Sequence, residues 1–161
     1  MTKMDTSKVS KLAQESFVAT YAEFNTPEDM QNHLQQQLSV DAFDALLADG
    51  DGDQVYLAYD DGFDRDIPIG FFQFSPRDWQ SGNRKAVEIL RFYIQPDVIG
   101  GGFGRKLMEA CVDQARELGY SLIWLGVWDR NQRAIGFYQR LGFAHVGEKT
   151  FVLGSDVQSD W

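Results

Sequence analysis

The first fifty residues repeat their apolar side chains at the spacing of amphipathic helices. This pattern predicts a first helix over about residues 7–22. Thr26 is a favourable N-cap and Pro27 suits the first helical position, so a second helix is predicted over 26–38. A short third helix is expected over 41–48. The N-terminal third of the chain is therefore predicted to be helical.

The pattern then changes to short apolar runs of the kind found in strands. One run lies at 54–59, between turns rich in Asp and Gly, and another follows at 67–75. The run at 85–96 is longer and more apolar, as expected of a central strand covered on both faces. Further strands are predicted over 121–128 and 144–154.

Two helical patterns alternate with these later strands. Residues 103–118 carry one apolar face and stop at Gly119, a natural C-cap. Residues 131–143 repeat the pattern, and Gly142 marks the end of that helix. The order is helices, antiparallel strands, then strand, helix, strand, helix, strand. It predicts a single domain of the α+β (mixed α/β) class.

Composition narrows the classes of function. The 161 residues carry a formal charge of −9, which argues against a nucleic-acid partner, because nucleic-acid-binding proteins present a basic face. A cationic small molecule suits this charge better, although acidic surfaces also serve solubility. The single cysteine, Cys111, lies on the apolar face of a predicted helix and is expected to be a packed core thiol. The sequence has neither a membrane-length apolar run nor a leader pattern, so we expect a cytoplasmic protein without a membrane partner.

No metal is expected. The stretch "DGDGD" at 49–53 resembles the start of a calcium loop, but Gln54 and Asp60 stand where that loop requires Gly and Glu. His33 and His145 show no metal-ligand spacing, and we interpret both as structural or surface residues.

The stretch "IGGGFGRKL" at 99–107 runs directly into a predicted helix. Glycines before a helix N-terminus expose backbone N–H groups and a positive dipole end to an anion. The P-loop pattern fails because Gly100 and Gly104 have the wrong spacing. The dinucleotide pattern fails because Arg105 stands in place of its third glycine.

The wider sequence resembles the core of the GCN5-related N-acetyltransferase (GNAT) superfamily. "VEILRFYIQPDVIGGGFGRKLMEAC" followed by "LIWLGVWDRNQRAIGFYQRLGF" carries the resemblance, which covers roughly residues 86–143. It implies a central mixed, mostly antiparallel sheet with helices on both faces and a splayed central strand pair. It also implies acetyl-CoA as cosubstrate, with the diphosphate bound at the glycine turn. Ile99 stands where the family has Gln or Arg. The residues implied to bind the coenzyme here are Ile99, Gly100, Gly101, Gly102, Phe103, Gly104, Arg105 and Lys106, although the last two fit solvated helix positions equally well.

The resemblance assigns further coenzyme contacts outside the glycine turn. Phe92, Tyr93 and Ile94 are implied to pair their backbone with the pantetheine, one amide facing the thioester oxygen. Asn131 occupies the position of a coenzyme-contacting Asn, and helix capping explains it equally well. Trp128 either walls the acceptor site or belongs to the core.

Two residues are candidates for the acid and the base of acetyl transfer. Tyr138 occupies the position of the family's proton donor to the departing thiolate, and the competing interpretation is core packing. Glu88 is the only carboxylate in an apolar strand, where a carboxyl group holds a proton more readily and suits a general base. The competing role of Glu88 is an ion pair with Arg91, which requires a bulge to bring both side chains to one face.

A subgroup resemblance bears on the acceptor. Among other stretches, "YAEFNTPEDMQNHLQQQLS" and "TFVLGSDVQSDW" resemble the Pai-type polyamine N-acetyltransferases, which implies spermidine or spermine as the amine. Four acidic residues are candidate attractors: Glu28, Asp29, Asp156 and Asp160. The alternatives are a protein or drug amine as acceptor, or a non-catalytic module that senses acetyl-CoA.

We expect one acetyltransferase domain over 1–161. Residues 1–80 are assigned to the acceptor side, 86–143 to acetyl-CoA binding and 144–161 to a C-terminal strand. In the subgroup, "SDW" opens a final strand that inserts into the sheet, whereas this sequence stops at Trp161, and its opening strand is reduced to "MTKM". We therefore expect either shortened termini or a sheet completed by a second copy in a homodimer.

Overall fold

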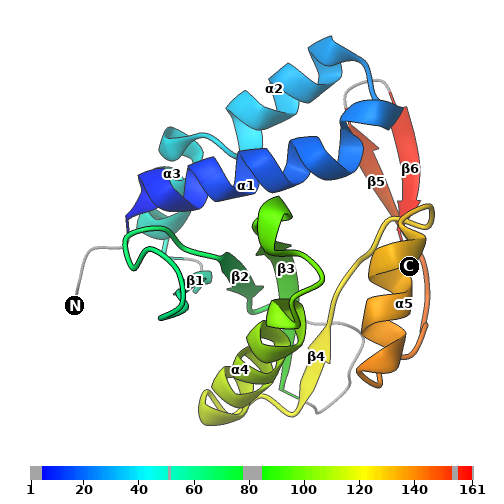
Figure 1. The fold of residues 1–161 in the computed structure, drawn as a ribbon. Helices are drawn as coiled ribbons and strands as arrows, with labels where there is room; N and C mark the ends of the chain where they lie inside the picture. Colours follow the sequence, from blue (N-terminus) through cyan, green and yellow to red (C-terminus); the bar gives the residue numbers. More distant parts are fainter. Residues whose placement is uncertain (1–4, 51, 78–84, 154–155, 161) are drawn as a thin grey trace.

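A computed structural model describes residues 5–50, 52–77, 85–153 and 156–160 (Figure 1). The helices are α1 (Thr6–Tyr21), α2 (Pro27–Gln37), α3 (Val40–Ala48), α4 (Phe103–Glu117) and α5 (Gln132–Arg140), with 3₁₀ turns η1 (Ala22–Phe24) and η2 (Pro96–Val98). The strands are β1 (Gln54–Ala58), β2 (Gly70–Ser75), β3 (Ala86–Ile94), β4 (Leu122–Trp124), β5 (Lys149–Leu153) and β6 (Asp156–Asp160).

Side-chain caps fix the starts of the first three helices. The oxygens of Asp5, Thr26 and Ser39 accept hydrogen bonds from backbone N–H groups in the first turns of α1, α2 and α3. Pro27 follows its cap at the first helical position, where no N–H is needed. The three predicted N-terminal helices are confirmed to within one or two residues at their ends.

The sheet has the strand order β1-β2-β3-β4. β1, β2 and β3 pair antiparallel, and β3 pairs with β4 in parallel over residues 86–88 and 122–124 only. The register of β2 against β3 shifts between Gln73 and Phe74, which is a β-bulge in β3 at Leu90. The predicted mixed, mostly antiparallel sheet with a splayed strand pair is confirmed.

Three strands are shorter than their apolar runs predict. Pro68 has no N–H to donate, and pairing in the run at 67–75 begins only at Gly70. After Trp124 the chain leaves β3, so the prediction of a strand over 121–128 is wrong for its second half. Residues 144–148 form no strand. Apolar side chains in 125–127 line cavities instead of pairing across the sheet.

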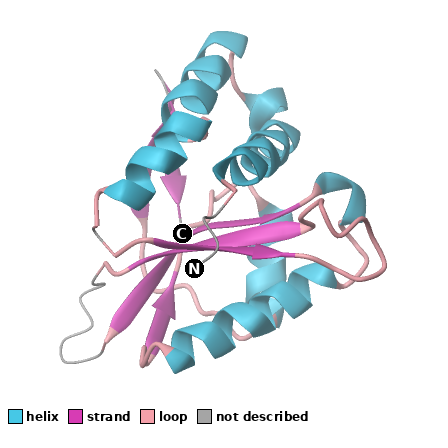
Figure 2. Cartoon of the chain, turned by 90° about the vertical axis from the view of Figure 1, so that its left-hand side faces the viewer, coloured by secondary structure: helices cyan, strands magenta, loops and turns pink. Residues whose placement is uncertain are grey.

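Helices cover both faces of the sheet, as Figure 2 shows with the sheet seen nearly edge-on. On one face, α1, α2 and α3 enclose a cluster that includes Phe17, Leu38, Phe43 and Phe71. On the other, α4 and α5 pack on the cluster that contains Phe74, Val87, Leu107 and Cys111. Burial raises the pKa of the Cys111 thiol to about 12, consistent with the predicted core role.

β5 and β6 form a separate antiparallel hairpin. An antiparallel bridge between Trp128 and Asp160 ties this hairpin to the segment after β4. The strand β6, "DVQSD", thus begins before the "SDW" segment and pairs with β5 instead of joining the four-stranded sheet. The "MTKM" segment and Trp161 lie outside the described residues.

Candidate active site

The glycine turn connects β3 to α4 through η2. Gly100 and Gly102 have φ of 97° and 80°, in the left-handed region, and a Cβ at either position would meet open space. Their backbone conformation is therefore the reason for glycine at these two positions. Gly102 is the N-cap of α4, and its carbonyl accepts the hydrogen bond from Lys106 N–H at 3.3 Å. The N–H groups of the first turn of α4 therefore point along the helix axis, past the turn, toward where an anion would bind.

Within this turn the residues differ in function. Gly101 N–H donates to the Val98 carbonyl at 3.3 Å, which closes the turn. Gly104 is in the helix, where a Cβ would lie 3.2 Å from the Phe137 ring, so its small size lets α4 approach α5. Ile99, at the position of the expected polar residue, is 43% exposed.

The two cations after the turn have partners of their own. The Arg105 guanidinium forms an exposed ion pair with the Glu109 carboxylate at 3.0 Å. The Lys106 ammonium lies 5.4 Å from the centre of the Phe103 ring. Both contacts fit solvated helix residues, one of the two roles that the sequence leaves open.

The splay between β3 and β4 opens a cavity of about 390 Å³ on the side of α1 and α2. It brings together residues that are far apart in the sequence. Its lining includes Glu88, Arg91, Phe92, Tyr93, Trp128, Asn131, Tyr138 and Asp160. Of the predicted site residues, Ile94 and the segment 99–106 lie outside this lining, Ile94 at the end of β3 and the segment in the turn and first residues of α4 that follow it.

Glu88 lies at the closed end of the splay, where it is paired in register with Trp124. It is 1% exposed and lines the cavity. The Trp124 indole N–H donates to the Arg77 carbonyl at 3.1 Å and closes this end. Glu88 is therefore a buried carboxylate facing a space large enough for a small substrate.

The bulge in β3 brings Arg91 to the same face of the sheet as Glu88, and both line the cavity. The Arg91 guanidinium donates to the side-chain amide oxygen of Gln73 and, at 3.2 Å, to the Gln37 carbonyl. Gln73 in turn donates to Asp53 at 2.8 Å. The structure therefore has the bulge that an ion pair between Glu88 and Arg91 requires. The hydrogen bonds to Gln73 and Gln37, however, hold the Arg91 guanidinium toward β2.

Tyr138 projects from α5 into the apolar cluster beside the splay. Its ring contacts Phe92, Phe137 and Phe143 edge-on, with centroids 5.2–6.3 Å apart. Burial, with smaller contributions from Tyr93 and Cys111, raises the pKa of Tyr138 well above its usual value. The hydroxyl is therefore protonated throughout the physiological range.

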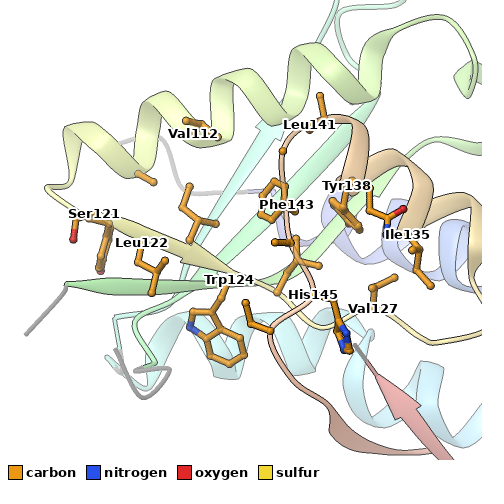
Figure 3. A pocket seen from close by; sticks show the side chains of 18 of the residues that line it. Val112, Ser121, Leu122, Trp124, Val127, Ile135, Tyr138, Leu141, Phe143 and His145 are labelled. Atoms are coloured by element: carbon orange, nitrogen blue, oxygen red, sulfur yellow. The ribbon is translucent and has the colours of Figure 1, made fainter. Parts of the chain in front are cut away.

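Tyr138 also borders a second, larger cavity of about 730 Å³ on the outer side of β4, shown in Figure 3. Apolar side chains from α4, β4, α5 and the segment 143–146 dominate its walls, and Glu88 is not among them. This cavity is not the candidate reaction site despite its larger size, because no carboxylate of the described residues lines it together with Tyr138.

The coenzyme-contacting positions outside the turn are placed as follows. Asn131 lines the splay cavity, and its side chain caps α5 by accepting from Ala134 N–H at 3.1 Å. Phe92 and Tyr93 line the cavity from opposite faces of the bulged strand. The Ile94 carbonyl accepts from the Ser16 hydroxyl at 3.2 Å, which ties the end of β3 to α1.

The cavity also contains residues that the sequence did not indicate. Phe17 and Tyr21 from α1 and His33 from α2 form one wall, and Arg77 stands at the rim. The helical periodicity marks Phe17 and Tyr21 only as apolar positions, and no signal in the sequence relates His33 to the site. Of the four candidate attractors, Asp160 lines the cavity, while Glu28 and Asp29 occupy the first turn of α2.

Among the described residues, no group of three or more His, Cys, Asp or Glu side chains is arranged to hold a metal ion. In the same residues, no helix combines the length and apolar character needed to span a membrane.

Comparisons with known proteins agree on the fold and the reaction. An uncharacterised N-acetyltransferase of Lactobacillus delbrueckii subsp. lactis is 29% identical over 100% of this chain and 91% of its own length. The L-amino acid N-acyltransferase MnaT of Escherichia coli is 37% identical over 48% of this chain and 44% of its own length. The PaiA N-acetyltransferase of Thermoplasma acidophilum, crystallised with coenzyme A, superposes with a TM-score of 0.69 at 20% identity. The match covers 97% of this chain and 91% of that one.

The family profile described as acetyltransferase (GNAT) family matches residues 11–143. This range contains the glycine turn and every described residue that lines the splay cavity except Asp160. Together with the N-acetyltransferase relatives, the match makes acetyl-CoA the cosubstrate. The chain belongs to the GNAT family of N-acetyltransferases.

Proposed function

We propose that this N-acetyltransferase moves the acetyl group of acetyl-CoA to a primary amine bound in the splay cavity, with Glu88 as base and Tyr138 as acid. One observation carries the assignment: a single cavity is lined by both a 1% exposed carboxylate and a partly buried phenol, on the two sides of the splay. Residues of α1 and α2 line this cavity on the face of the sheet opposite to α4, and the acceptor is proposed to bind on that face.

The reaction is a direct transfer in a ternary complex. The amine nitrogen attacks the thioester carbon, the N–C bond forms and the C–S bond breaks. Glu88 takes the proton lost by the nitrogen, directly or through one water. Tyr138 donates its proton to the departing thiolate, whose thiol has an ordinary pKa of about 8.5. A backbone N–H of Phe92, Tyr93 or Ile94 stabilises the oxyanion.

The coenzyme is proposed to lie along the open part of the splay. Its diphosphate binds the N–H groups at the start of α4, in the turn formed by residues 99–104, and its pantetheine runs beside the backbone of 92–94. Asn131 contacts the coenzyme with its side-chain amide NH2 group, since its capping bond uses only the amide oxygen. Arg105 and Lys106 add positive potential near the diphosphate.

Polyamines, spermidine or spermine, are the acceptors we propose first. The net charge of −9 attracts a polycation over long range. The cavity itself offers two carboxylates, Glu88 and Asp160, among aromatic rings. Both features suit an amine that carries further positive charges.

An amino acid is the second candidate acceptor. Arg77 and Arg91 line the same cavity and suit the carboxylate of such a substrate. The E. coli relative MnaT is an L-amino acid N-acyltransferase, which supports the same class.

An assay of CoA release separates these candidates. We expect spermidine and spermine to react faster than L-amino acids, lysine-containing peptides and drug amines. Faster turnover of an amino acid or a peptide would replace the polyamine assignment. Tight acetyl-CoA binding without turnover of any amine would instead indicate a sensing module.

Substitution of the acid tests the mechanism. Tyr138→Phe is expected to lower kcat by about 10²–10⁴ with little change in coenzyme affinity, because only the proton donor is lost. Steady-state kinetics and calorimetry with coenzyme A measure the two quantities. Tyr59→Phe is the matched control, because Tyr59 is 45% exposed and lies outside the cavity. Unchanged kcat in Tyr138→Phe would remove this residue from the mechanism.

We further propose that the enzyme acts as a homodimer in the cytoplasm. The sheet order supports the dimer, since β4 is one of the two edge strands of the described four-stranded sheet and borders the larger apolar cavity.

A further inference from the structure

The splay cavity has an asymmetric distribution of charge around Glu88. β3, which carries Glu88, lies between β2 and β4. Arg91 is held on the β2 side by its bonds to Gln73 and to the Gln37 carbonyl. Asp160 lies on the other side, bridged to the segment that follows β4. An extended cation with one nitrogen at Glu88 is therefore repelled on one side and attracted on the other.

The bridge fixes the position of the Asp160 carboxylate. Residues directly opposite in an antiparallel bridge place their side chains on the same face, with Cβ atoms about 4.5–5.5 Å apart. Asp160 and Trp128 therefore project together, and both line the cavity. They are 8% and 4% exposed, so any ligand they contact is largely removed from water.

Aromatic rings pack against Trp128, the residue opposite Asp160 in the bridge. The Trp128 ring centroid lies 5.3 Å from that of Tyr21 and 5.1 Å from that of Phe24. Burial first, and then the nearby charges of Tyr93 and Asp160, raise the pKa of Tyr21. The charge of Asp160 thus contributes to the electrostatic environment of the Tyr21 hydroxyl, and both residues line the cavity. A carboxylate beside indole and phenol faces is a favourable environment for an alkylammonium ion.

We propose that Asp160, Trp128 and Tyr21 form a subsite for the second ammonium group of a diamine or polyamine whose first nitrogen reacts at Glu88. The inference rests on the proposed function and specifies its acceptor. Asp160 neutralises the second ammonium group, and the rings of Trp128 and Tyr21 cover that group and the methylene groups next to it. Arg91 repels the second ammonium group from the β2 side of Glu88. The enzyme therefore distinguishes a diamine from a monoamine of the same length.

The test compares 1,4-diaminobutane with pentylamine, which replaces the second ammonium by a methyl group. For the wild type we expect kcat/KM to be at least about tenfold higher with the diamine, after allowance for its two equivalent nitrogens. Asp160→Asn should reduce this ratio about tenfold, mainly by raising KM for the diamine. Asp160→Glu should retain part of the preference.

Matched controls separate this effect from general changes. Asp113→Asn makes the same charge change on α4, where the side chain is 71% exposed, and should leave the ratio unaltered. Trp128→Leu is an independent variant that should also lower the ratio. Because both rates are measured in one variant, a loss of folded protein lowers them together and does not alter the ratio.

The outcomes distinguish the two levels of the proposal. An unchanged ratio in both Asp160→Asn and Trp128→Leu, with normal pentylamine turnover, would overturn the subsite and leave the amine acetyltransferase intact. No turnover of any amine by the wild type would overturn the proposed function. In that case, calorimetric titration of 1,4-diaminobutane into the CoA-saturated wild type and Asp160→Asn decides the subsite: equal affinities contradict it.

Discussion

At the scale of single residues, His33 is a neutral ring in the wall of the splay cavity. It stacks on Phe17 with ring centroids 4.3 Å apart. Burial first, and then the positive charge of Arg91, lower the pKa of His33 to about 4. At neutral pH the ring therefore contributes apolar surface and no charge. Glu88, Arg91 and Asp160 supply charge elsewhere in the cavity lining.

This shift predicts a dependence of stability on pH. The pKa in the folded state is below the ordinary value of 6.5, so the unfolded chain binds the proton more readily. The contribution of neutral His33 is complete above pH 6.5 and is lost as the pH falls toward 4. His33→Phe retains the stacking and removes the titration. Urea unfolding at pH 7 and pH 4.5 should show a smaller loss of stability for His33→Phe than for the wild type; equal losses would contradict the assignment.

At the scale of elements, the turn before α4 combines two uses of glycine. Gly102 is required by its φ of 80°, whereas Gly104 is required by contact with the Phe137 ring. Phe137 precedes Tyr138 in α5, so the contact at Gly104 connects the coenzyme turn with the proposed acid. The turn and the catalytic helix are thus positioned by one packing contact.

Alanine substitutions distinguish the two uses. Gly102→Ala should cost about 1–2 kcal/mol, because an L-residue is strained in the left-handed region, and should weaken coenzyme binding. Gly102→Asn, which tolerates this region better, should recover part of both losses. Gly104→Ala gains helix propensity and crowds Phe137, so its main effect should be on kcat. Urea unfolding, coenzyme A calorimetry and kinetics measure these quantities; identical profiles for the Gly102 and Gly104 alanine variants would refute the distinction.

The bulge in β3 is the second decisive feature at this scale. Without it, Glu88 and Arg91 would point to opposite faces of the sheet. With it, the strand places a carboxylate and a guanidinium on one side of the cavity and still contributes Ile89 and Phe92 to the apolar cluster under α4. The local irregularity therefore creates the polar character of the site without opening the core.

At the scale of the whole molecule, the edge strand β4 is the feature that bears on assembly. Its outer side borders an apolar cavity of about 730 Å³, and Val146 on the rim is 71% exposed. Exposed edges and apolar surface of this kind favour pairing with another strand. This is the physical basis of the proposed homodimer.

Solution mass tests the dimer. Sedimentation equilibrium should give twice the chain mass of 18.3 kDa. Val146→Lys should shift the mass toward the monomer, because it places a charge on the apolar rim. Val18→Lys, at a 41% exposed position on α1, is the control and should leave the mass unchanged. A monomer for the wild type at micromolar concentration would contradict the proposal.

The sequence by itself determined the helices, the order of elements along the chain and the family. Periodicity and capping residues such as Thr26 are local signals, and the glycine turn followed by the "NQRAIGFY" segment is a contiguous pattern. Glu88 and Tyr138 were identifiable because an isolated carboxylate in an apolar strand and a tyrosine in a known motif both stand out within a few residues of sequence.

Only the tertiary structure decided which residues line the splay cavity. Phe17, His33, Arg77 and Asp160 come from four separate segments, and neither spacing nor composition relates them. The bulge at Leu90 and the bridge at Trp128 set their directions, and both depend on how strands pair rather than on any one strand's residues. The apolar run at 121–128 led to a strand prediction that is too long for the same reason. Side chains after Trp124 face cavities on either side of the splay, and the local sequence does not indicate where two strands separate.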